Sequence, residues 1–530
     1  MEEKLEKKQR QGFVLGALIL AVSGFLGKVF GAIFKIPLTN MVGTAAMGYF
    51  SSAYSVYVFL LAIATSGIPV GLAALISRYL ALERYKDLKS LMRMTTIIFV
   101  CIGAVFSALG MIFAKDIAII MNSEKAYYCV LLLMPAVFFI SIVSIHKGFF
   151  QGYNNMMPTA ISNIIEAFSK LVFGCGIAYL LNINGFDNEI TVAGAIGGVT
   201  IGTILASIFM FFRYIFRNKS YRITQKDFMS QSNPTPDRQI LSEFIKITFP
   251  VTISSVAVNL FSMVDAFFVV NRLKAYLDIN TSEVMWGSYS NIALTIFNLP
   301  SFLVISIGIS LIPSIAAAYA KNEHESIKNT VNKALKYSSI LAFGCAFGLN
   351  AVAEQAIKLF FNTSSNELVI ATQLLEIISF ALIAVGLTNV TASILQSVGK
   401  AYLSVVSVAI GAVIKTICTF TFVGIPSINI LGAPIATNIA YPIMLLLNFI
   451  FIFKYVKILP NFMEVFLKPL LAGFLCFLTA KGSLMIFENI IKGKLLIFPV
   501  ILLSVLVYFA AIFLLKLVTF DEIKQIIKKR

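Results

Sequence analysis

The sequence has few charged residues for its length. Only 13% of its 530 residues are charged, 58% are hydrophobic, and the mean hydropathy is +0.89. An ordinary soluble domain has about 25% charged and about 45–50% apolar residues. A soluble protein could not bury so much apolar surface, so we expect lipid to be the solvent. This excludes a cytosolic enzyme, a nucleic-acid-binding protein and a disulfide-stapled secreted domain.

Histidine and paired cysteines are also scarce. The chain has two His and six Cys, no Cys-x-x-Cys pair is present, and each cysteine stands alone in an apolar stretch. We therefore predict no metal site, no cofactor and no redox pair. Acidic residues are outnumbered, which leaves a net charge of +17. In a membrane protein this excess is typical of loops that face anionic lipid, so it does not indicate nucleic acid.

Long apolar runs dominate what is present. A helix needs about 20 apolar residues to cross the hydrocarbon core. Continuous apolar runs, rather than the alternating segments of a barrel, predict an all-α polytopic membrane protein whose first span is retained. The fourteen predicted spans are 11–35, 46–77, 92–114, 126–146, 157–182, 190–213, 243–271, 284–318, 335–353, 367–388, 401–423, 431–453, 467–487 and 495–516.

Basic residues indicate the orientation of these spans. If the N-terminus lies inside, most of the 42 Lys and Arg fall in inner segments. Because cytoplasmic loops carry the excess of Lys and Arg, both termini are predicted to be cytoplasmic.

The two halves of the chain repeat each other. At an offset of 245 residues, Gln151 matches Gln396 and Lys170 matches Lys415, and an offset of 239 matches earlier apolar positions. Six spans separate the partners, so the repeat is parallel, as in transporters that rock two lobes around a midplane site. We expect two six-helix lobes in a parallel pseudo-twofold repeat plus two C-terminal helices. The expected parts are an N-terminal lobe (1–216), a cytoplasmic linker (217–239), a C-terminal lobe (240–456) and a final pair of helices with a basic tail (457–530).

Basic residues within the spans point to an anionic ligand. Lys28, Lys170 and Lys415 fall deep in predicted spans, and Arg272 lies near the outer end of another. A charge in the hydrocarbon region costs about 2.5–3.5 kcal/mol, so each needs a reason. If they face one cavity, they would suit a phosphate or pyrophosphate.

Three acidic residues within spans are candidates for ion coupling or for charge pairs. Glu166 stands four residues before Lys170, so the two could neutralise each other on one helix face. Asp265 would bind a coupling proton or Na⁺, or pair with a basic side chain on another helix. Glu376 favours interhelical hydrogen bonding. Amide side chains that line a polar cavity, or that bond helices together, are Gln151, Gln396, Asn163 and Asn291.

Three stretches carry a family resemblance: SGFLGKVFGAIFKIPL from Ser23, MGYFSSAY from Met47 and ATSGIPV from Ala64. The chain resembles the polysaccharide and lipid II flippases of the multidrug/oligosaccharidyl-lipid/polysaccharide (MOP) superfamily. Within it, the similarity is to the group of YtgP and stage V sporulation protein B, relatives of MurJ. The resemblance implies a cationic cavity that Lys28 helps to line, and a groove for a lipid tail formed by the last two helices. After Gly31 the chain departs from MurJ-type sequences, because it has Phe34-Lys35 where they carry an Arg-Asp pair.

The resemblance implies a transporter rather than an enzyme. The expected function is an alternating-access flippase of the bacterial cytoplasmic membrane. It would move an undecaprenyl-pyrophosphate-linked precursor, with lipid II as the leading candidate, from the inner to the outer leaflet. Coupling to Na⁺, H⁺ or the membrane potential is expected, and cell-wall synthesis machinery is the expected partner. The alternatives are a flippase for another lipid-linked polysaccharide or a spore-cortex precursor, and a multidrug/cation antiporter, which the deep lysines disfavour.

Overall fold

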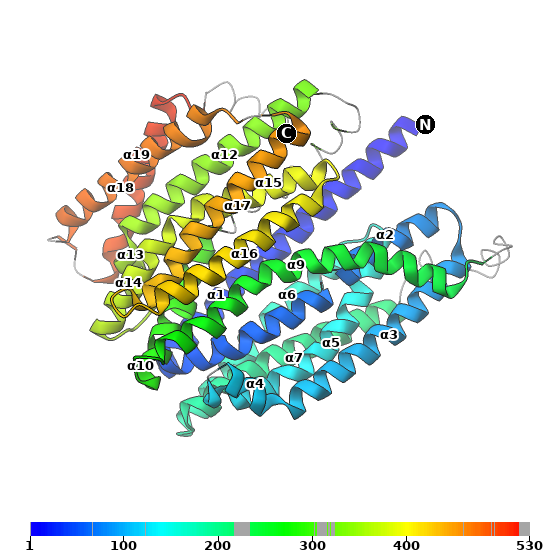
Figure 1. Ribbon diagram of the computed structural model, residues 1–530, viewed down its shortest axis with the longest axis horizontal. Helices are drawn as coiled ribbons and strands as arrows, with labels where there is room; N and C mark the ends of the chain where they lie inside the picture. The colour runs from blue at the N-terminus through cyan, green and yellow to red at the C-terminus, as the bar shows by residue number, and fades with distance from the viewer. Residues whose placement is uncertain are drawn as a thin grey trace. The chain divides into compact units, whose positions relative to one another are not determined.

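The structure is a computed structural model. It describes residues 2–518 except 66, 122, 217–233, 302, 305–314, 316–318, 320–323, 459, 489 and 492. The residues described are helical or lie in short turns between helices, and none of them forms a β-strand (Figure 1). The all-α prediction is therefore confirmed for this part of the chain.

The chain divides into two compact units, Met1–Asn271 and Arg272–Arg530. The boundary falls near the end of the helix Asp237–Leu273, so most of that helix belongs to the first unit. The predicted linker, 217–239, lies largely outside the described residues.

The first unit is built from long helices that pack against their neighbours in the chain. α6 packs chiefly against α7 and α1, and α5 packs against α7, α3 and α2. Its elements are α1 (Glu2–Thr65), α2 (Gly67–Ala81), α3 (Tyr85–Ile112), α4 (Ala114–Ile120), the 3₁₀ turn η1 (Glu124–Ala126), α5 (Tyr127–Gly152), α6 (Met157–Ile183), α7 (Asn188–Ile215) and α9 (Asp237–Leu273).

α1 joins two predicted spans without an intervening loop. The sequence predicts spans at 11–35 and 46–77, but the structure continues as helix through the residues between them. The one break in helical geometry inside α1 is Gly43, with φ 81° and ψ 170°. A side chain disfavours this positive φ, so glycine lets the chain kink within a single residue.

The second unit has the same kind of architecture. α16 packs against α17, α15 against α17, and α12 against both α15 and α18. Its elements are α10 (Ile279–Gly287), the π-helical turn η3 (Ser288–Ala293), α12 (His324–Ala351), α13 (Ala353–Phe360), α14 (Ser365–Ser379), α15 (Ala381–Ser397), α16 (Ala401–Val423), η4 (Asn429–Leu431), α17 (Gly432–Val456), η5 (Met463–Leu467), α18 (Lys468–Phe487), η6 (Lys494–Leu496) and α19 (Ile497–Leu514).

The helices repeat at the spacing that the sequence indicates. At an offset of 239 residues, α3 maps onto α12 with both ends in register, and α4 begins where α13 begins. At an offset of 245 residues, α6 and α7 map onto α16 and α17 within a few residues. The extra six residues fall where the first unit has one helix, α5, and the second has two, α14 and α15.

A helix-ending turn confirms this register at atomic detail. After α5, the N–H of Asn155 donates to Phe150 O, and the N–H of Asn154 donates to Gln151 O. After α15, the residues 245 positions later make the same two bonds. Both are Schellman turns, and the residue with positive φ is Asn154 in the first and Gly399 in the second. The matched glutamines therefore occupy the same place at the end of two equivalent helices.

Ten helices in the described residues are long and apolar enough to cross a membrane, or eleven if the bent pair α12–α13 is one span. The stretch Val22–Ala81 counts once here although the sequence predicts two spans in it, and the predicted span 284–318 contains residues outside the described part. The number fourteen thus remains a prediction.

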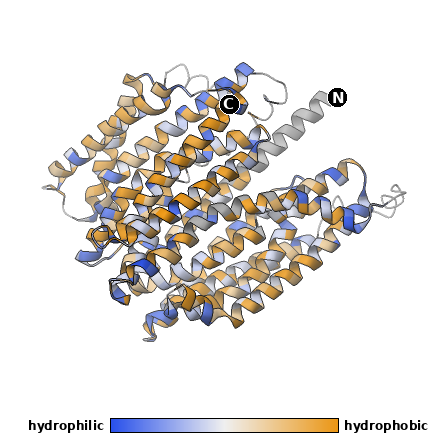
Figure 2. Ribbon diagram, in the orientation of Figure 1, coloured by the Kyte–Doolittle hydropathy of each residue, from blue (hydrophilic) through white to orange (hydrophobic). Residues whose placement is uncertain are grey.

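Apolar residues cover the helices, and hydrophilic residues gather near helix ends and connections (Figure 2). Large apolar side chains are widely exposed, such as Ile112 at 71% and Leu514 at 82%. Such exposure is disfavoured in water and expected in lipid. The protein is therefore a multi-pass membrane protein.

Candidate cationic site

Lys170 lies on α6 and is held by aromatic side chains of α1. Its Nζ donates to the hydroxyl of Tyr54 at 3.3 Å, and it lies 4.5 Å from the centroid of that ring and 4.9 Å from the Phe34 ring. The negative face of an aromatic ring attracts a cation. These contacts hold the ammonium group beside α1.

Lys28 and Lys35 add two further cations to this region. They stand seven residues apart on α1, which places them two helical turns apart on one face. The side chain of Lys28 is exposed, and that of Lys35 is half-buried. Lys35 lies close enough to both Lys28 and Lys170 for their like charges to interact. The three lysines together define what we call the cationic site.

Close helix packing positions the site. A Cβ on Gly174 of α6 would come within 2.6 Å of the Phe34 ring, so only glycine lets that ring lie against the helix. A Cβ on Gly198 of α7 would overlap the backbone of Gly174. The small residues thus let α1, α6 and α7 approach closely, as small residues do in membrane helices.

Glu166 lies one turn before Lys170 but does not form an ion pair with it in the described structure. Its charge acts on Lys147 of α5 and on Tyr57 of α1. Lys147 donates to Asn163 Oδ1 at 2.8 Å. The Tyr57 hydroxyl is buried and has no hydrogen-bond partner among the described residues.

The other predicted site residues of the first unit lie apart from these contacts or end a helix. Gln151, at the end of α5, donates to Thr159 Oγ1 at 3.4 Å. Asp265 is 4% exposed within α9.

In the second unit, Lys415 is 4% exposed within α16. Glu376 is partly exposed on α14, with Oε1 3.9 Å from Lys481 Nζ of α18. Asn291 is fully buried in the π-helical turn η3, where its amide donates to Ser290 Oγ at 3.1 Å.

Arg272 contacts the end of α16. Its Nε donates to Phe420 O at 3.1 Å, and its guanidinium lies 4.2 Å from the Phe420 ring centroid. Directly after the last residue of α16, a Cβ on Gly424 would overlap the guanidinium. A cation beside the last carbonyls stabilises a helix C-terminus. Gln396, at the end of α15, is exposed.

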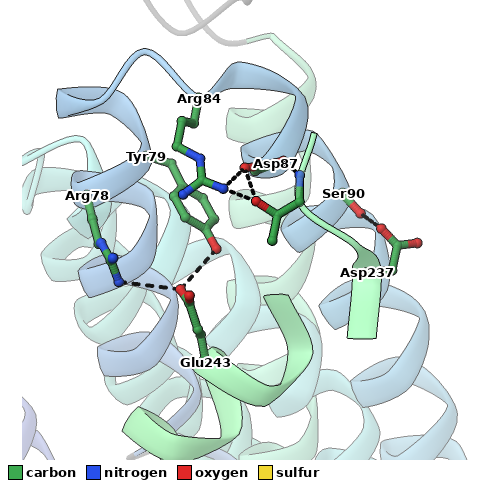
Figure 3. Close-up of polar contacts among 8 residues, drawn as sticks. Arg78, Tyr79, Arg84, Asp87, Ser90, Asp237 and Glu243 are labelled. Carbon is green, nitrogen blue, oxygen red and sulfur yellow. Dashed lines mark hydrogen bonds and ion pairs between the residues drawn. The ribbon is translucent and has the colours of Figure 1, made fainter. Parts of the chain in front are cut away.

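A second polar cluster joins the α2–α3 connection to the start of α9 (Figure 3). Asp87 is fully buried, and its carboxylate accepts from the backbone N–H and the hydroxyl of Thr235, each at 2.8 Å. Arg84 lies 2.6 Å from the same carboxylate and also contacts Thr235. Beside them, Glu243 of α9 lies 3.4 Å from Arg78. We call this group of residues the clasp.

Lys35, Tyr54, Phe34 and the clasp are not among the site residues predicted from the sequence. Lys35 is the last residue of the predicted span 11–35, yet its seven-residue spacing from Lys28 places both on one helix face. The aromatic partners of Lys170 carry no local signal, because an aromatic residue in a membrane helix is usually a packing residue.

Repeated apolar helices with charged residues inside them are typical of a membrane transporter. The chain belongs to the polysaccharide biosynthesis protein family, whose model matches residues 13–319. The MatE family model matches residues 250–421. The family resemblance expected from the sequence is therefore confirmed.

Relatives extend over most of the chain. Lipid II flippase MurJ of Bacillus subtilis is 23% identical over 454 residues, 82% of each chain. Stage V sporulation protein B of the same organism is 22% identical over 431 residues, 81% of each chain.

Solved structures share the fold. Lipid II flippase MurJ in an inward closed conformation has a TM-score of 0.67 at 17% identity, covering 93% of this chain and 98% of that one. An inward-facing multidrug resistance MATE family transporter of the MOP superfamily has a TM-score of 0.66 at 16% identity, covering 84% and 99%.

Proposed function

We propose that the protein is an alternating-access flippase that moves an undecaprenyl-pyrophosphate-linked precursor across the bacterial cytoplasmic membrane, with lipid II as the leading substrate. The observation that carries the proposal is the proximity of Lys28, Lys35 and Lys170 within membrane-length helices. A charge in the hydrocarbon region costs about 2.5–3.5 kcal/mol, so basic residues gathered within membrane helices favour a negatively charged ligand. A pyrophosphate supplies that charge.

The driving force follows from the charge of this substrate. An inside-negative potential favours outward movement of negative charge by about 2.3 kcal/mol per charge per 100 mV. We propose coupling to this potential, with Na⁺ or H⁺ as alternatives. Both termini would be cytoplasmic, and the cell-wall synthesis machinery would consume the product.

A spore-cortex precursor is the second candidate substrate, because stage V sporulation protein B is among the relatives. A cation antiporter fits less well, because the lysines of the cationic site repel cationic compounds.

Complementation tests the proposal. The chain is expressed in a bacterium depleted of its lipid II flippase, beside Lys28→Ala, Lys35→Ala and Lys170→Ala variants of equal membrane abundance. The matched control is Lys358→Ala, which removes an exposed lysine that pairs with Glu354 on its own helix.

Rescue by the wild type and the control, with loss in the cationic-site variants, is the expected result. Rescue by every variant would remove the lysines from the mechanism. Absence of rescue by a well-inserted wild type would exclude lipid II and leave another lipid-linked glycan as the substrate.

A further inference from the structure

Glu166 and Lys170 have the spacing of an ion pair but lie in different surroundings. A Glu four residues before a Lys is the favourable order for a pair on a helix. In the described structure, however, the Lys170 ammonium contacts the hydroxyl and ring of Tyr54 and the ring of Phe34. The cation therefore lies beside α1, away from its nearest carboxylate in sequence.

The carboxylate of Glu166 has alternative neighbours of its own. Lys147 and Tyr57 lie close enough to Glu166 for its charge to act on them. The Tyr57 hydroxyl is 1% exposed and donates to no described residue. An unpaired buried donor costs free energy, so an acceptor that reaches it in another side-chain conformation is favoured.

The matching position of the second unit lacks this carboxylate. Lys415 corresponds to Lys170 at the 245-residue offset, and the residue that corresponds to Glu166 is Gly411. Lys415 thus has no carboxylate one turn before it. The arrangement is specific to the first unit.

We infer that Glu166 is an internal counter-ion that competes with the anionic substrate for Lys170 and so promotes its release. The inference rests on the proposed function. When pyrophosphate occupies the cationic site, Glu166 turns toward Lys147 and Tyr57. When the substrate leaves, Glu166 neutralises Lys170, whose flexible four-carbon side chain spans one helical turn. The lysine is never left as an uncompensated charge in the membrane.

The inference predicts that Glu166→Gln binds the substrate more tightly and releases it more slowly. The probe is undecaprenyl pyrophosphate, titrated onto the full-length purified protein in detergent, with undecaprenol as the probe that lacks the pyrophosphate. We expect a Kd about tenfold lower than that of the wild type. This tenfold change in Kd lies between the roughly twofold change expected from a solvated ion pair on a helix and the larger change expected from an ion pair at low dielectric. Translocation of fluorescent lipid II in proteoliposomes should become slower.

Three further variants isolate the cause. Asp116→Asn, which removes an exposed carboxylate from α4 of the same unit, should leave the Kd unchanged. Adding Glu166→Gln to Lys170→Ala should give no gain over Lys170→Ala alone. Tyr57→Phe removes the alternative donor, drives Glu166 toward Lys170 and should weaken binding about threefold. It provides a test with the opposite sign should Glu166→Gln fail to fold.

The outcomes separate the two proposals. A wild type that binds undecaprenyl pyrophosphate no better than undecaprenol would overturn the proposed function and this inference with it. A wild type that binds the probe, together with a Glu166→Gln variant of equal or weaker affinity, would overturn the inference alone. If Glu166→Gln does not fold, a Tyr57→Phe variant that binds the probe with wild-type affinity would overturn the inference instead.

Discussion

Replacing Asp87 by alanine should release the start of α9 from the α2–α3 connection. The carboxylate is fully buried and accepts two hydrogen bonds from Thr235 and an ion pair from Arg84. Its loss leaves the Thr235 N–H without an acceptor, at about 1–3 kcal/mol. Breaking a buried ion pair costs about 3–5 kcal/mol, and less here because Arg84 is partly exposed. We expect a local destabilisation of about 3 kcal/mol.

Hydrogen–deuterium exchange measures this loss where it occurs. Because about 1.4 kcal/mol corresponds to a factor of ten, protection of the amides of residues 238–245 should fall about a hundredfold in Asp87→Ala. Asp87→Asn keeps one oxygen acceptor and should show a smaller loss.

The control is Asp187→Ala, because Asp187 precedes α7 without a side-chain capping bond and is exposed. Unchanged protection of residues 238–245 in Asp87→Ala would refute the clasp as an anchor of α9. Equal loss of protection in Asp187→Ala would show that the effect is not local.

Two further substitutions test the packing on which the sites depend. Gly198→Ala should prevent a stable fold, because the new methyl group would overlap the backbone of Gly174. The control Gly197→Ala should be tolerated, because its new methyl group meets its nearest atom at 4.0 Å. Size-exclusion chromatography of the detergent-solubilised variants measures the difference. Arg272→Ala should lower the melting temperature through the lost bond to Phe420 O, worth about 1–2 kcal/mol. An unchanged melting temperature with lost binding of undecaprenyl pyrophosphate would instead support Arg272 as a substrate ligand.

Helix positions were largely predictable because membrane helices are long apolar runs. The span predicted at 401–423 is α16 itself, and the span at 157–182 differs from α6 by one residue. The repeat was predictable because matched polar residues, such as Lys170 and Lys415, are rare in apolar helices. The kink at Gly43 was not predictable from hydropathy, because α1 remains apolar and helical on both sides of it.

The contacts of the site depend on partners far apart in the chain. Helical spacing puts Lys28 and Lys35 on one face, but it does not identify the helix that faces them. Lys170 meets Tyr54 across 116 residues, and Asp87 meets Thr235 across 148 residues. Such contacts follow from the packing of whole helices, on which local sequence patterns carry little information.

The close approach of α6 and α7 has a mechanical consequence for the cationic site. Gly174 lies against Gly198, and a Cβ on Gly202 of α7 would come within 2.7 Å of Glu166 O. The helix α6, which carries Lys170, is therefore closely packed along α7. In contrast, α1 is kinked at Gly43, with Lys28 and Lys35 before the kink and Tyr54 after it. Phe34, next to Lys35, lies against Gly174, so the part of α1 before Gly43 is held to α6. The spacing between Lys35 and Lys170 is thus set by the packing of α1 on α6, and the kink at Gly43 lets Tyr54 also reach Lys170.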